Sequence, residues 1–209
     1  AWVLSELGRN HPYGQPIVDV GYAGSYFAEM CCQFGPVTGV DPRQTPRITH
    51  PWFTHRWPPE QPPLPPVPYT AVCVSVLEHL PRAQAAGVLG GLALAPQALI
   101  TVPLAPTAHQ FRGYRPFTLP EIWDWPGCAA FGVFRRESGN WWRSLNGDFI
   151  GAARGQETIL AAIVEHLPES SEHQVNAVAC VRLTNPPPPP PSDEPPSPVP
   201  DSGDQSRSA

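Results

Sequence analysis

The chain has 209 residues and a formal net charge of −5, and 41% of its residues are hydrophobic. This length suits one compact domain that buries a core. All 13 basic residues are arginine, so the sequence offers neither a Schiff-base lysine nor a Walker-A lysine. The acidic balance argues against a nucleic-acid partner, and no apolar run reaches the ~18 residues of a membrane span. We therefore expect neither a nucleic acid nor a membrane as a partner.

Five cysteines are spread along the chain, at Cys31, Cys32, Cys73, Cys128 and Cys180. Their number is odd, and no two of them form a CxxC pair. We expect reduced thiols that pack as small hydrophobic side chains, with no metal site. Reduced cysteines also predict a cytoplasmic location.

Composition divides the chain at residue 185. Residues 1–185 carry the apolar segments and are predicted to form the folded domain. Residues 186–209 contain ten prolines and are predicted to form a disordered, extended tail. Proline-rich segments can dock on SH3-like grooves, so a protein partner for the tail stays an alternative. A second proline-dense stretch, at 58–68, is predicted to be a stiff surface loop.

Strand and helix patterns alternate through the first 185 residues. Strands are predicted at 16–20, 37–41, 52–57, 71–77, 98–104, 128–134 and 175–183. Helices are predicted at 2–9, 26–34, 82–94, 118–125 and 155–167. The strand at 71–77 (AVCVSVL) is almost continuously apolar, as is typical of a strand buried on both faces. This alternation predicts an α/β fold with right-handed crossovers.

A turn of small residues follows the first predicted strand. Asp19 stands near the end of that strand, and the turn 21–25 (GYAGS) leads into a helix. Small residues let a ligand approach the backbone, and a helix N-terminus offers free N–H groups. Asp41 ends the next strand, which would be a neighbour in a parallel sheet. An acid there can accept hydrogen bonds from both hydroxyls of a ribose.

Four segments occur in a characteristic order: IVDVGYAGSYF (17–27), VTGVDPR (37–43), YTAVCVSVLEHL (69–80) and ALITVPL (98–104). Together they resemble class I S-adenosylmethionine-dependent methyltransferases, and in particular the type 11 and type 12 small-molecule methyltransferases. The resemblance covers about residues 15–104. It implies a Rossmann-like, mostly parallel doubly wound sheet with a C-terminal antiparallel strand. It also implies an enzyme that uses S-adenosylmethionine to methylate a small-molecule substrate.

The resemblance assigns a cofactor site to the turn and to the ends of neighbouring strands. Its positions here are Asp19, Gly21, Tyr22, Ala23, Asp41, Pro42, Ser75 and Val76. Asp19 would lie near the methionine ammonium group, Asp41 would bind the ribose and Pro42 would flank the adenine. Ser75 and Val76 would face the sulfonium.

The substrate side is less sharply defined. By the same resemblance, Glu78 and His79 begin the segment that edges the substrate pocket. His79 is a candidate catalytic base because histidine titrates near neutral pH, although a structural role before the following turn is an alternative. His109, Tyr114 and Arg115 stand where related enzymes carry a substrate lid and are candidate substrate contacts.

The sequence departs from the family pattern at several positions. The usual Gly-x-Gly-x-Gly turn reads Gly21, Ala23 and Ser25, and Thr70 stands where an acid usually begins the fourth strand. These departures keep open a catalytically inactive, methyltransferase-like binding or scaffold protein. A dehydrogenase-type dinucleotide binder is disfavoured because no GxGxxG motif is present. A nucleic-acid methyltransferase would also be expected to carry a basic face.

Overall fold

The computed structural model describes residues 2–42, 48–56, 67–106, 114–138, 141–144, 150–151 and 176–185. Residues 58–66 of the loop predicted at 58–68, the helix predicted at 155–167 and the tail at 186–209 lie outside the described residues. His109 lies outside them as well.

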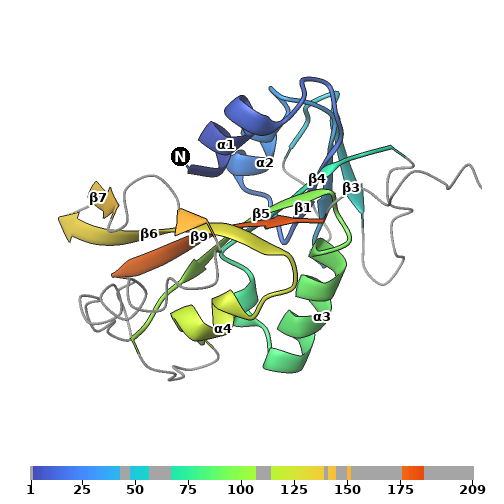
Figure 1. Cartoon of the computed structure of the whole chain (residues 1–209). Coiled ribbons are helices and arrows are strands. Elements are labelled where there is room, and N and C mark those ends of the chain that lie inside the picture. Colours follow the sequence, from blue (N-terminus) through green and yellow to red (C-terminus); the bar gives the residue numbers. More distant parts are fainter. Residues whose placement is uncertain are drawn as a thin grey trace, which may run out of the picture.

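One sheet lies between two pairs of helices (Figure 1). The helices are α1 (Trp2–Asn10), α2 (Tyr26–Cys31), α3 (Arg82–Leu92) and α4 (Leu119–Trp123), with a 3₁₀ helix η1 (Leu77–His79). The strands are β1 (Ile17–Val20), β2 (Val37–Val40), β3 (Phe53–Arg56), β4 (Thr70–Val74), β5 (Gln97–Pro103), β6 (Cys128–Ser138), β7 (Trp141–Ser144), β8 (Ile150–Gly151) and β9 (Ala177–Thr184). Helices α1 and α2 cover one face of the sheet, and α3 and α4 cover the other.

The strand order is β3-β2-β1-β4-β5-β9-β6-β7, and β8 pairs with β6. Strands β1 to β5 are mutually parallel where they pair. Strand β9 runs antiparallel to both β5 and β6. The predicted doubly wound α/β sheet with a C-terminal antiparallel strand is confirmed.

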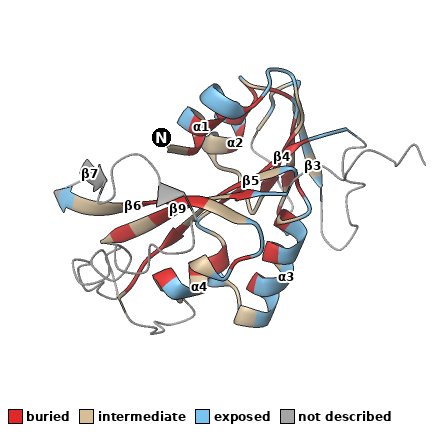
Figure 2. Ribbon diagram, in the orientation of Figure 1, coloured by how far each residue is buried: buried red, intermediate tan, exposed pale blue. Residues whose placement is uncertain are grey.

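Buried residues occur along the strands and on the helices of both faces of the sheet (Figure 2), and the apolar ones form two clusters of different size. The larger cluster lies on the α3/α4 face and includes Leu89, Ile100 and Phe131. The smaller cluster lies under α1 and α2 and includes Leu7 and Leu99. Because neighbouring residues on a strand point to opposite faces, Leu99 and Ile100 contribute to different clusters.

Two predicted elements end three residues earlier than expected. Helix α2 stops at Cys31 rather than continuing to residue 34, because the next N–H groups bond back only three residues in tight turns, as Phe34 does to Cys31. Strand β4 stops at Val74, because Ser75 takes a left-handed φ of 54° that extended backbone cannot continue. Strand β6 runs on to Ser138 and pairs with β7 and β8, which the apolar pattern did not predict.

Helix α1 is fixed to the sheet by packing and by charge. Its residues Val3 and Leu7 are buried against the sheet, and Glu6 of the same helix is only 4% exposed. The Glu6 carboxylate lies 3.7 Å from the guanidinium of Arg182 on β9 and 3.9 Å from that of Arg9. The first helix is thereby connected to the last described strand.

All five cysteines are free, as predicted, and four of them are buried. Burial raises the pKa of the Cys128 thiol to about 11 and that of Cys180 to about 12. The thiols are therefore neutral near pH 7 and pack as hydrophobic groups.

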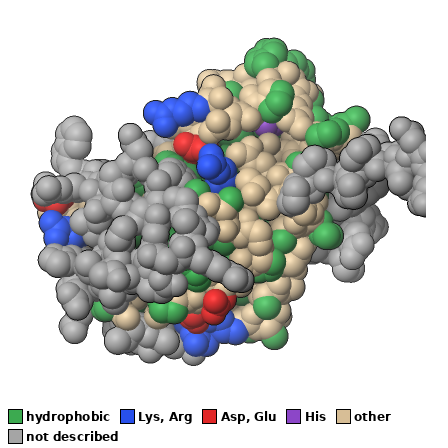
Figure 3. Space-filling view, in the orientation of Figure 1, with side chains coloured by type: hydrophobic (Ala, Val, Ile, Leu, Met, Phe, Trp, Pro, Cys, Tyr) green, Lys and Arg blue, Asp and Glu red, His purple; other side chains and the backbone are tan. Residues whose placement is uncertain are grey.

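Charged side chains on the face seen in Figure 3 form small mixed clusters of both signs rather than one basic surface. Among the described helices, none has the length and hydropathy needed to cross a membrane.

Candidate functional site

The sheet reverses its direction of growth between β1 and β4. From β1 the chain proceeds outward to β2 and β3, and it then returns to β4 on the other side of β1. In doubly wound sheets, ligands bind at the carboxyl ends of the strands on either side of such a point. Here that region holds the turn after β1, the end of β2 and the residues after β4.

The turn begins at Gly21, which requires glycine for two reasons. Its φ is +75°, a conformation that other residues adopt only with strain. A Cβ atom at this position would also collide with the side chain of Val76. The Gly21 N–H donates to the Val40 carbonyl at 2.7 Å, which closes the turn onto the end of β2. Val76 therefore packs directly on the turn.

Asp41 connects the end of β2 to the same turn. Its carboxylate is buried, and Oδ2 accepts a hydrogen bond from the Ala23 N–H at 2.9 Å. The prediction that the ends of β1 and β2 are neighbours in a parallel sheet is confirmed, and the structure adds this contact between Asp41 and the turn. An anionic group held at this edge suits recognition of neutral hydroxyls.

Asp19 is the most enclosed acid of the site. Its side chain is 1% exposed, and its Oδ2 has no hydrogen-bond partner among the described residues. Burial, and to a smaller extent the negative charge of Asp41, raises the Asp19 pKa from 3.8 to about 7. A buried carboxyl with an unpartnered oxygen is costly when ionised, and a cation bound beside it would favour the ionised form.

Tyr22 directs its side chain away from the turn and onto the outer strands. Its hydroxyl lies 2.8 Å from His55 Nδ1, and its ring packs against Phe53 with centroids 5.2 Å apart. Gly39 of β2 leaves the space that the ring occupies. Only the backbone of Tyr22 remains to line the turn, and the His55 contact was not predicted from the sequence.

Two residues near the site adopt the left-handed region without being glycine. Ala23 has a φ of 53° and Ser75 has a φ of 54°. Each such residue costs of order 1 kcal/mol or more. Strained backbone of this kind tends to occur where a ligand is held. Pro42, after Asp41, is exposed.

A second polar group follows β4. Glu78 is 2% exposed, and burial raises its carboxyl pKa from 4.5 to about 7. The His79 ring is mostly exposed, with Nε2 3.9 Å from Glu78 Oε1. The His79 ring also packs edge-on against Tyr114 at 5.6 Å, and the Arg115 N–H donates to the Glu78 carbonyl at 2.8 Å. Four of the five predicted substrate-side residues thus meet in one cluster.

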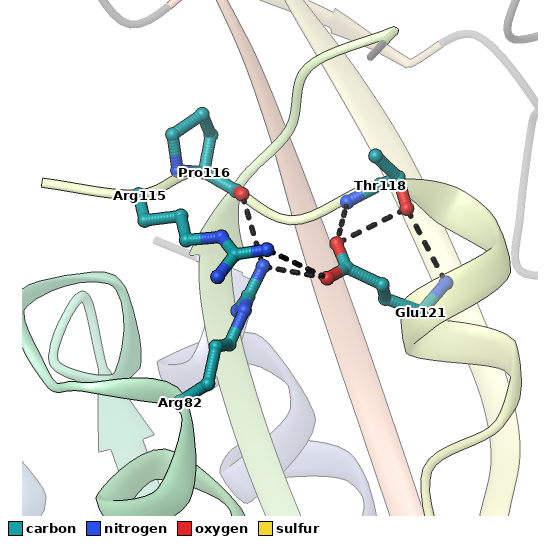
Figure 4. Close-up of polar contacts among 5 residues, drawn as sticks. All are labelled: Arg82, Arg115, Pro116, Thr118 and Glu121. Atoms are coloured by element: carbon teal, nitrogen blue, oxygen red, sulfur yellow. Dashed lines mark hydrogen bonds and ion pairs between the residues drawn. The ribbon is translucent and has the colours of Figure 1, made fainter. Parts of the chain in front are cut away.

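Arg115 is also held from its other end (Figure 4). Its guanidinium lies 4.0 Å from the Glu121 carboxylate, which receives a 2.7 Å hydrogen bond from Arg82. Arg82 in turn lies over the Phe117 ring, 3.9 Å from its centroid. Glu121 and Thr118 form the capping box that begins α4. This network fixes the segment 114–118 to α3 and α4, and a substrate role for Arg115 stays a prediction.

The described residues contain no group of three metal-ligating side chains. Burial raises the pKa of the Tyr114 hydroxyl, and the charge of Glu78 adds to this effect. That hydroxyl has no hydrogen-bond partner among the described residues. Its burial could not be read from the sequence, because it depends on how the segment after β5 folds back on η1.

Sequence comparison does not place the chain in a family: no protein-family model matches it, and neither does any curated protein. Solved structures do match. A SAM-dependent methyltransferase from Archaeoglobus fulgidus is 16% identical, over 88% of this chain and 93% of that chain, with a TM-score of 0.52. One from Anabaena variabilis is 12% identical, over 88% and 83%, with a TM-score of 0.53. Magnesium protoporphyrin IX methyltransferase from Synechocystis with bound SAH is 13% identical, over 88% and 81%, with a TM-score of 0.51.

The chain therefore has the fold of class I methyltransferases. At these identities the likeness concerns the fold alone. The reaction has to be argued from the turn, the two acids and the cluster after β4.

Proposed function

We propose that the chain transfers a methyl group from S-adenosylmethionine to a small-molecule acceptor. The observation that carries this proposal is the pair of acids at one turn: Asp41 bonded to the Ala23 N–H, and Asp19 buried beside it with an oxygen that lacks a partner. The cofactor offers hydroxyls for the first acid and a cationic ammonium group for the second. The residues present therefore fit this group.

The chain's own residues bind and orient in this mechanism. When bound, S-adenosylmethionine supplies a methyl group on a positively charged sulfur that is already activated for in-line displacement. Asp41 would hold the ribose, and Asp19 would ionise beside the ammonium group. Gly21 keeps the turn open to close approach, and Ser75 and Val76 would lie against the sulfonium end. Alignment and exclusion of water then supply most of the rate.

An acceptor that carries a proton at its nucleophilic atom has to lose it. Glu78 is suited to hold that proton, because its carboxyl pKa of about 7 balances the two protonation states near neutral pH. His79, the base expected from the sequence, has a mostly exposed ring beside Glu78. We propose Glu78 as the proton-holding group and His79 as its neighbour.

The test is calorimetric titration of the folded protein with S-adenosylmethionine and S-adenosylhomocysteine, with NADH as the negative control. We expect binding of both sulfur compounds and none of NADH. Asp41→Ala should weaken binding by about 1–3 kcal/mol, the scale of a hydrogen bond to a charged group. Asp124→Asn is the control, since Asp124 is an exposed acid after α4.

Absence of binding by a protein with an intact thermal transition would overturn the proposal. The inactive, methyltransferase-like binding protein would then become the better account of the same fold. Equal losses in Asp41→Ala and Asp124→Asn would remove Asp41 from the ribose site while leaving the cofactor assignment standing.

A further inference from the structure

A cavity of about 410 Å³ lies between α1, α2 and the sheet. Its lining comes from six elements, through Trp2 of α1, Phe27 of α2, Val74 of β4, Thr101 of β5, Phe134 of β6 and Cys180 of β9. None of the eight lining side chains is charged. The volume falls in the range of small-molecule sites, which are about 300–1,000 Å³.

The register of the sheet accounts for the hollow. Val74 pairs with Thr101, and Thr101 pairs with Cys180. Three small to medium-sized side chains therefore lie in one row across the strands on the α1/α2 face. Helix α2 has six residues and α1 has nine, and the apolar cluster beneath them takes most of its strand residues from β1, β2 and β4. The described helices therefore leave part of β5, β9 and β6 uncovered on this face, where the cavity lies.

The cavity adjoins the proposed cofactor site through two chain neighbours. Phe27 follows Tyr26, the first residue of α2, directly after the turn. Val74 immediately precedes Ser75, one of the residues assigned to the sulfonium end. A ligand in the cavity would thus lie next to the start of α2, which follows the turn, and next to Ser75, which is assigned to the sulfonium end.

The polar groups of the lining are neutral. They include the Thr101 hydroxyl and the Cys180 thiol. Burial keeps the thiol protonated near neutral pH, since its pKa is raised to about 12. Transfer of an ionised group into such surroundings is strongly unfavourable, whereas apolar surface gains about 25 cal/mol per Å².

We propose that this cavity binds the body of the methyl acceptor, and that the acceptor is a neutral, apolar molecule with a flat ring system. This inference rests on the proposed function. Trp2, Phe27 and Phe134 supply aromatic walls that suit a ring, and the Glu6–Arg182 ion pair fixes α1 as the roof. A charged or sugar-like acceptor would find no matching group in the lining.

The experiment uses 1-aminoanthracene, a neutral fluorescent ring compound, and anthracene-1-sulfonate, a charged compound of the same ring. Fluorescence titration of the full chain should give micromolar binding of the neutral probe and at least tenfold weaker binding of the sulfonate. Val178 of β9 also lines the cavity, so Val178→Phe should fill it and weaken binding of the neutral probe at least tenfold. Val88→Phe is the matched control, because Val88 is equally half-buried but lies on α3.

A second variant guards against misfolding of the first. Phe134→Ala removes a half-buried aromatic side chain from the lining and should also weaken binding of the neutral probe. Calorimetry with S-adenosylhomocysteine is run on every variant, and its affinity should not change.

The outcomes separate the two proposals. Equal binding of the two probes, or wild-type affinity in both Val178→Phe and Phe134→Ala, would overturn the cavity assignment even if S-adenosylhomocysteine binds. Failure of S-adenosylhomocysteine to bind while the probe does would overturn the methyl-acceptor identity of the occupant and the proposed function together.

Discussion

The two sides of the sheet are built from the same strands and differ in almost every physical respect. On the α3/α4 face, Ile100 and Phe131 are fully buried in one large apolar cluster. The α1/α2 face and the adjoining carboxyl edge contain a cavity of about 410 Å³, the buried acid Asp19 and the left-handed residues Ala23 and Ser75. Stability is concentrated on one side, and the capacity to hold a ligand on the other.

The difference arises from the covering helices. Helix α3 has eleven residues, and α4 is fixed by its capping box and by the Arg82–Glu121 ion pair. On the other face, Trp2 and Val3 of α1 and Phe27 of α2 line the cavity rather than fill it. Among the described residues, the apolar cluster beneath α1 and α2 is the smaller of the two.

The largest expected effect is the difference in lost stability between alanine variants of two phenylalanines on β6. Phe131 is 0% exposed and packs edge-on against Trp123, so Phe131→Ala should cost about 3–5 kcal/mol of unfolding free energy. Phe134 lines the cavity on the opposite face and is half-buried, so Phe134→Ala should cost about 1 kcal/mol. Urea denaturation of both variants measures the difference. Equal losses would show that the two faces are packed alike.

The next effect concerns Asp19 and pH. The folded-state pKa is about 7, above the ordinary aspartate value of 3.8, so folding favours the protonated carboxyl. The wild type should therefore lose stability as pH rises from about 4 to about 7, by on the order of 3 kcal/mol.

Asp19→Asn cannot ionise and should lack this loss, being more stable than the wild type at pH 8 but not at pH 4. Thermal unfolding at both pH values is the measurement, and Glu78→Gln should behave similarly because its carboxyl pKa is also raised to about 7. Parallel pH profiles for wild type and Asp19→Asn would mean that Asp19 is ionised without cost in the folded protein.

A smaller effect is expected at the turn. Gly21→Ala adds a Cβ that collides with Val76 at a φ of +75°, and it should cost about 2 kcal/mol. Combining Gly21→Ala with Val76→Ala should recover the stability lost through the collision with Val76. It should not recover the stability lost through the left-handed backbone conformation. A double-mutant cycle read by denaturation separates the two. Complete recovery would show that the backbone can relax freely at this turn.

The smallest effect has the opposite sign. Ala23→Gly removes a side chain from a residue at φ 53° and should stabilise the protein by about 0.5–1 kcal/mol, since relief of strain exceeds the added chain entropy. The same change at Ala95, which is buried on the other side, should destabilise it. A destabilising Ala23→Gly would argue that the turn is not strained.

Much of the fold could be predicted from the sequence because each central strand is bounded by clear turn residues. The strand at 17–20 and the acid at Asp41 follow from local pattern, and the structure brings that acid to the turn. The end of β4 could not be predicted, because the left-handed Ser75 is set by its surroundings rather than by its residue type.

The site was predicted less completely, for a related reason. The burial of Glu78 depends on the segment at 114–117 returning to η1, and the Tyr22–His55 contact depends on the space left by Gly39. The cavity depends on the placement of α1 and α2 over the sheet and on the sheet register together. Such features are properties of tertiary contacts, which local patterns do not contain.

The position of β9 bears on how this chain is made. Strand β9 lies between β5 and β6 and pairs with both. Gln97 at the start of β5 pairs with Thr184 at the end of β9, so the free edge of β5 is paired only after residue 184 has been synthesised. During synthesis from the N-terminus, the edge of β5 would stay open while the next eighty or so residues emerge. Such an unpaired apolar edge invites association with other chains. Slow translation or a premature stop in this interval should therefore yield aggregates rather than a shortened but folded protein.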